Sequence, residues 1–157
     1  MSSNRKAQIG TVVLLAAVVG IAIGKSHLRR PSAPVPEGPQ DVVYAMLNAA
    51  RAGDVKSYLA TYTGPMEAGL RQTVSETSAA SFAQYLKTTA ASIKGVATSD
   101  PENISDQEAK LRVEFIYQDR NEAQTMYLEK RSGAWKIARA DAGERVPTLI
   151  PYGTPVK

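Results

Sequence analysis

The stretch from Glu108 to Asp141 alternates apolar and polar side chains over most of its length. A period of two places one set of side chains on one face, which is typical of a half-buried strand. In the first part of the stretch the apolar set is Ala109, Leu111, Val113, Phe115 and Tyr117. Turn residues at 119–121 and at Ser132-Gly133 divide the stretch. It therefore predicts three antiparallel strands, over about residues 109–118, 122–131 and 134–140.

The segment before these strands has the periodicity of amphipathic helices. We expect a first helix from Pro39, a residue tolerated at helix starts, to the stop signal Gly53. Asp54 then caps a second, short helix. A third helix carries Met66, Leu70 and Val74, a fourth begins near Ala79, and a first strand lies within 92–99. At helical spacing we expect the tyrosines of these helices to be core residues with hydrogen-bonded hydroxyls rather than pocket residues, namely Tyr44, Tyr58, Tyr62 and Tyr85. The expected fold class is α+β, with three to four helices and four strands in a domain over residues 39–141.

The N-terminal part of the chain indicates a membrane anchor. Residues 7–24 carry no charged side chain, and a helix of this length spans about 27 Å, close to the hydrocarbon thickness of a bilayer. Residues 1–6 form a short tail before it, and residues 25–38 combine a basic flank with a Pro-rich linker. We expect a single-pass anchor in a bacterial inner membrane. A cleaved signal peptide is the alternative, with Ala22-Ile23-Gly24 as a weak cleavage site.

Two signals in the sequence bear on the side of the membrane on which the domain lies, and they point in opposite directions. Two basic residues precede the apolar segment and three follow it, which leans towards a cytoplasmic C-terminus. A short basic N-terminus followed by a spacer and a domain is nevertheless the usual plan of an exported domain, so we expect a periplasmic domain. Ala16, Gly20 and Gly24 share one helix face on which two anchors could pair, although small residues are common in all membrane helices.

Composition argues against several classes of site. The chain has no cysteine, which removes disulfides and thiolate chemistry, and its one histidine, His27, lies in the basic flank. We therefore expect no metal site and no cofactor. Residues 1–30 hold five basic residues and no acid, leaving fourteen basic against fifteen acidic residues in the remainder. The net charge of +4 is thus a signal of the membrane flank, and we expect no nucleic-acid partner.

The C-terminal tail, residues 142–157, contains three prolines and several apolar side chains. Proline lacks the N–H group that a central strand needs. Two arrangements fit such a segment. It packs on its own domain, which we favour, or it presents an extended surface to a partner.

Two features of the chain resemble the nuclear transport factor 2-like superfamily, the cystatin-like α+β cones, and its small membrane-anchored or exported bacterial members. One is the helix–helix opening around Arg51-Ala52-Gly53-Asp54, and the other is the closing strand pair with Gly133, Trp135, Lys136 and Ile137. The resemblance covers about residues 38–141. It implies a curved antiparallel sheet wrapped around helices, with a pocket that relatives use for small molecules, catalysis or protein contacts.

The pocket candidates are Tyr117, Tyr127 and Arg139, the last because it shares the strand parity of Trp135 and Ile137. Asp41 and Asp54 sit at helix starts, where capping explains them better than catalysis, so no catalytic residue is expected. The favoured function is a membrane-tethered, non-enzymatic binding or assembly module with a protein partner or a second copy of itself. A small-ligand carrier or sensor is the alternative, followed by an isomerase- or dehydratase-type enzyme.

Overall fold

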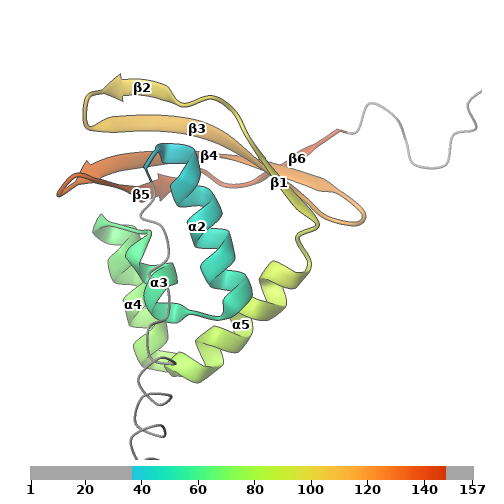
Figure 1. Cartoon of the computed structure of the whole chain (residues 1–157). Coiled ribbons are helices and arrows are strands. Elements are labelled where there is room, and N and C mark those ends of the chain that lie inside the picture. Colours follow the sequence, from blue (N-terminus) through green and yellow to red (C-terminus); the bar gives the residue numbers. More distant parts are fainter. Residues whose placement is uncertain (1–36, 148–157) are drawn as a thin grey trace, which may run out of the picture. The chain divides into compact units, whose positions relative to one another are not determined.

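The computed structural model describes residues 37–147 (Figure 1). The expected anchor at 7–24, the tail at 1–6, the linker up to residue 36 and residues 148–157 lie outside the described part. Within residues 37–147, none of the helices combines the length and the apolar character that a membrane crossing requires.

The helical half follows from local signals in the sequence. Gly53 ends the first helix with φ 67°, a left-handed conformation that suits glycine. The Asp54 carboxylate accepts the backbone N–H of Ser57 at 3.0 Å and its hydroxyl at 2.7 Å, which confirms Asp54 as a helix cap. Asp41 likewise accepts the Gly38 N–H at 3.0 Å. The helices are α2 (Pro39–Ala52), α3 (Val55–Ala60), α4 (Gly64–Thr77) and α5 (Ala79–Ala91).

The sheet is antiparallel, and β3 and β4 form its centre. Its strands are β1 (Gly95–Thr98), β2 (Glu102–Ser105), β3 (Glu108–Ile116), β4 (Asn121–Arg131), β5 (Ala134–Ala140) and β6 (Glu144–Val146). One side of β3 is paired by β1 and β2 in turn, and one side of β4 by β5 and β6 in turn. The sheet is therefore four strands wide, with each outer position shared by two short strands.

The α+β class is confirmed, but the expected four strands are six in the structure. Asp100-Pro101 interrupts the first outer strand as expected, yet pairing with β3 resumes in β2. The tail contributes β6, which pairs with Asn121–Ala123 before the next proline, Pro147. Both additions are strands of three or four residues at the margin of the sheet, where proline is tolerated beside them.

The core lies between the helices and one face of the sheet (Figure 1). Val42 and Val43 of α2 and Val113 and Ile137 of the sheet are 0% exposed. A second cluster joins α2 to α5 through Leu47, Phe82 and Leu86. Burying large aliphatic side chains contributes about 1.5–3 kcal/mol each, so both clusters stabilise the fold.

The free edge of β5 is covered by the segment between α3 and α4. The Ile137 N–H donates to the Thr61 carbonyl at 2.8 Å, and the Thr63 N–H donates to the Ile137 carbonyl at 3.0 Å. The Lys136 ammonium also donates to the Ala60 carbonyl. These bonds hold Tyr62, which forms a parallel bridge with Ile137, against the inner face of the sheet.

Candidate functional site

A cavity of about 290 Å³, which we call the inner pocket, lies between the helices and the inner face of the sheet. Helices α2, α3, α4 and α5 supply one side of it, and β3, β4 and β5 with the residue after β3 supply the other. It is lined by Met46, Leu47, Ala50, Tyr58, Tyr62, Met66, Tyr85, Leu86, Thr89, Ala90, Ile93, Phe115, Tyr117, Gln124, Met126 and Ala140. None of these side chains carries a charge at neutral pH, so the pocket is apolar with a few hydroxyl and amide groups.

Two tyrosines give the inner pocket its main polar feature. The Tyr62 hydroxyl donates to the Tyr58 hydroxyl at 2.9 Å, and the two ring centroids are 5.1 Å apart. Burial raises the pKa of Tyr62, and the Tyr58 contact raises it further. Burial also raises the pKa of Tyr58, partly offset by the hydrogen bond from Tyr62. Both phenols are therefore neutral at physiological pH and act through hydrogen bonds.

The Tyr58 hydroxyl has a proton to give. It accepts the bond from Tyr62, and no acceptor for its own proton is found among residues 37–147. A phenol is both donor and acceptor. A ligand oxygen in the inner pocket can therefore accept a hydrogen bond from Tyr58.

Tyr117 stands at the rim of the inner pocket, next to the β3–β4 turn. The Arg120 guanidinium lies 4.4 Å from the centre of its ring and pairs with Glu122 at 2.6 Å and with Asp119 at 3.0 Å. Burial raises the pKa of Tyr117, the Glu122 charge raises it further, and Arg120 opposes both. The rim charges are thus paired with one another.

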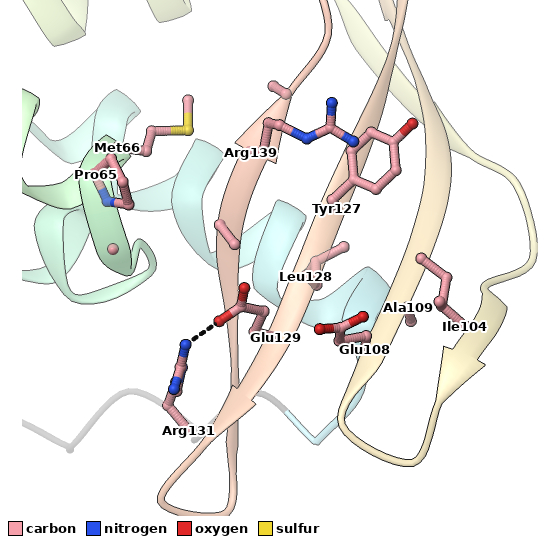
Figure 2. A pocket seen from close by; sticks show the side chains of 13 residues that line it. Pro65, Met66, Ile104, Glu108, Ala109, Tyr127, Leu128, Glu129, Arg131 and Arg139 are labelled. Atoms are coloured by element: carbon pink, nitrogen blue, oxygen red, sulfur yellow. Dashed lines mark hydrogen bonds and ion pairs between the residues drawn. The ribbon is translucent and has the colours of Figure 1, made fainter.

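A second and larger hollow of about 760 Å³, which we call the outer groove, runs along β4 and β5 (Figure 2). Ile104 of β2 and Glu108 of β3 line one end, and Gly64, Pro65 and Met66 of α4 line the other. Its charged side chains are two acids and two bases, Glu108, Glu129, Arg131 and Arg139. Glu129 pairs with Arg131, as the dashed line in Figure 2 marks.

The structure separates the three sequence-predicted pocket residues. Tyr117 lines the inner pocket, whereas Tyr127 and Arg139 line the outer groove. The Arg139 guanidinium stacks 3.6 Å from the centre of the Tyr127 ring, and both side chains contact Asp141, at 3.3 Å each. Arg139 is 61% exposed at its side chain.

Arg139 was expected to lie on the same face of the sheet as Trp135 and Ile137. This expectation is wrong because β5 contains one extra residue. Leu128 pairs with Ile137 but Tyr127 pairs with Arg139, so Ala138 is an extra residue in β5. Paired residues share a face. Leu128 and Ile137 are 1% and 0% exposed on the helix side, so Arg139 lies on the opposite face with Tyr127.

Sequence reasoning assigned Tyr58 and Tyr62 to the core and did not single out the methionines. Met46, Met66 and Met126 all line the inner pocket, which makes three of the four methionines of the chain pocket residues. Methionine is flexible and adapts to ligands of varied shape. The three methionines are far apart in the sequence, so their clustering cannot be recognised before the fold brings α2, α4 and β4 together.

No group of three or more His, Cys, Asp or Glu side chains that could hold a metal ion is found within residues 37–147. The chain thus has an α+β domain in which helices cover one face of a curved antiparallel sheet and enclose an apolar pocket (Figure 1). No family model and no curated protein matches the sequence.

Some solved structures align with part of this chain. A Campylobacter jejuni protein, provisionally named an NTF2-like transpeptidase, aligns over 65% of this chain and 98% of its own, with 19% identity and a TM-score of 0.46. Bdellovibrio bacteriovorus Bd1075 aligns over 68% of this chain and 39% of its own, with 14% identity and a TM-score of 0.35. The first carries the name of the superfamily that the sequence resembles. Both likenesses are too distant to assign an activity, a ligand or a partner to this chain.

Proposed function

We propose that the domain is a non-enzymatic binding module whose inner pocket takes a small, neutral and mainly apolar ligand with a hydrogen-bond acceptor. The observation that carries this proposal is the lining of the pocket, in which uncharged side chains surround the Tyr58–Tyr62 pair. Ligand pockets are usually apolar with a few placed polar groups. The inner pocket has this composition.

The size of the pocket limits the ligand. Its volume of about 290 Å³ is at the lower end of the roughly 300–1,000 Å³ range of small-molecule sites. A single ring or a short chain with one oxygen is the matching class. The Tyr58 hydroxyl is the donor that would orient such a ligand.

The lining also supports binding over catalysis. General acid–base chemistry needs a group whose pKa lies near the operating pH. The titratable groups in the lining are tyrosines, and burial moves the pKa of Tyr58 and of Tyr62 upwards, away from neutrality. The proposed module is therefore not an enzyme of the isomerase or dehydratase kind.

The tether in this proposal is the apolar segment at 7–24, with residues 25–38 as the spacer. The proposed location is the periplasmic face of a bacterial inner membrane. A protein partner or a second copy, as expected of an assembly module, would be recruited by the tethered domain.

The proposal is tested with two probes of similar size, one neutral and one anionic. We expect the full-length protein to bind para-fluoroacetophenone and to leave para-fluorobenzoate unbound, as followed by fluorine NMR line broadening of each probe. The ketone offers an acceptor to Tyr58, whereas the anion would lose its hydration without meeting a cation in the pocket.

Substitution of Tyr58 tests the hydrogen bond itself. A net hydrogen bond contributes about 0.5–1.5 kcal/mol, so Tyr58→Phe is expected to weaken ketone binding roughly 2- to 10-fold. Tyr44→Phe is the matched control, because Tyr44 is 41% exposed and does not line the pocket. Binding of the anion in preference to the ketone would contradict the proposal and would point to the arginines of the outer groove.

A further inference from the structure

The inner pocket and the outer groove touch at one place. Their linings have two residues in common, Met66 of α4 and Ala140 of β5. In Figure 2, Met66 projects from the start of α4 and faces the strands that carry Tyr127 and Arg139. Met66 and Ala140 therefore lie at the boundary between the two cavities.

Met66 is half-buried and packs against the core cluster that contains Tyr62 and Met126. Helix α4 buries none of its residues fully, and Gly64 at its start has open space where a side chain would stand. Methionine has an unbranched side chain that changes rotamer readily. Across this boundary, Ala140 fills little volume.

The strand on the other side supports the same arrangement. Ala138, the extra residue of β5, and Arg139 line the outer groove, whereas Ala140 returns to the inner face opposite Met126. The irregularity in β5 thus lets three consecutive residues form the wall that leads from one cavity to the other.

We propose that Met66 sets the length limit of the ligand by closing the inner pocket towards the outer groove. The ligand class is an unbranched, uncharged alkyl chain with a polar end, and its chain points along the line from the inner pocket to Met66. Removal of the Met66 side chain joins the two cavities and lets a longer chain pass into the groove. The ligand class rests on the function proposed above, whereas the position of the limit rests on the shared lining.

The test is a series of primary alcohols of increasing chain length, titrated against the full-length protein by calorimetry. Each buried methylene contributes about 0.8 kcal/mol, or roughly fourfold in affinity. For the unmodified protein we expect affinity to rise with length and then to level off. For Met66→Ala we expect the rise to continue, by roughly fourfold per added methylene, for two or more methylenes beyond that point.

Two variants are matched controls. Met46→Ala removes the same side chain from the inner pocket alone, because Met46 does not line the groove. It is expected to change affinity at every length without moving the limit. Tyr85→Ala serves the same purpose at an exposed position, 61% accessible, where folding is not at risk. Adding Ala140→Leu to Met66→Ala is expected to restore the original limit by refilling the space at this boundary.

The outcomes separate the two proposals. If alcohols bind but the affinity levels off at the same chain length in the unmodified protein and in Met66→Ala, the role of Met66 is overturned. The pocket function then stays in place. If the length limit moves in Met46→Ala or in Tyr85→Ala, the pocket is closed at another place, and the role of Met66 is again overturned. Absence of binding by every alcohol to both proteins overturns the pocket function and the inference together.

Discussion

At the scale of single residues, the arrangement depends on a buried pair of phenols. Tyr62 is 6% exposed and donates to Tyr58, and the two rings also contact each other. Sequence reasoning placed both side chains in the core with hydrogen-bonded hydroxyls, and for Tyr62 this is confirmed. Tyr44 and Tyr85, which shared that interpretation, are 41% and 61% exposed. Tyr44 lies on α2 and Tyr85 on α5, and helical spacing alone does not show which faces of these helices other elements cover.

The raised pKa of Tyr62 has a consequence for stability at alkaline pH. In the unfolded chain this phenol ionises near its ordinary value of 10.0, whereas in the folded protein it stays protonated to higher pH. The folded state then binds more protons, so the free energy of unfolding falls as pH rises above about 10. The fall is about 1.4 kcal/mol per pH unit for each such group.

Tyr62→Phe is expected to remove this contribution, making the loss of stability above about pH 10 shallower by about 1.4 kcal/mol per pH unit. Urea unfolding at a series of pH values measures it. Tyr44→Phe is the control, because Tyr44 is exposed and should leave the slope unchanged. Equal slopes for the Tyr62 variant and the unmodified protein would show that Tyr62 ionises freely in the fold.

At the scale of elements, the long strands and the helices were predictable because their signals are local. The alternation of apolar residues located β3, and the helix signals at Gly53 and Asp54 located two helix boundaries. The short strands β2 and β6 were missed, since three or four mostly exposed residues beside a proline carry no periodic signal. The extra residue Ala138 was also invisible, and it reversed the side on which Arg139 lies.

The ends of the helices provide a direct test of this local account. Gly53 has φ 67°, and an added Cβ would lie 3.2 Å from the Ala83 carbonyl oxygen. Gly69 is inside α4, with open space around its missing side chain. We expect Gly53→Ala to destabilise the protein by about 1–2 kcal/mol and Gly69→Ala to stabilise it by about 0.5–1 kcal/mol.

Both glycine variants are measured by urea unfolding at neutral pH. The opposite signs are the informative result, because the same added methyl group meets a left-handed helix end in one case and a regular helix in the other. Destabilisation of equal size at both positions would contradict the assigned boundaries of α2 and α4.

At the scale of the whole domain, the two faces of the sheet differ in character. The inner face meets the helices and encloses an uncharged pocket, whereas the outer face carries ion pairs such as Arg112–Glu144 and Lys110–Glu102. Exposed ion pairs of this kind contribute about 0–1 kcal/mol. The ligand binding proposed for the domain takes place on the inner face of the sheet. Tyr127 and Arg139, which were expected to line the pocket, lie on the outer face.

The methionines allow the most direct measurement of this claim. The chain has four, and Met46, Met66 and Met126 line the inner pocket while Met1 is outside the described residues. Carbon-labelled methionine methyl groups in the full-length protein are followed by NMR during titration with para-fluoroacetophenone. We expect the signals of Met46, Met66 and Met126 to shift together along one saturable curve and the Met1 signal to stay in place. A shift of Met66 alone would place the probe in the outer groove, and unchanged signals for all four methyl groups would contradict a ligand-binding inner pocket.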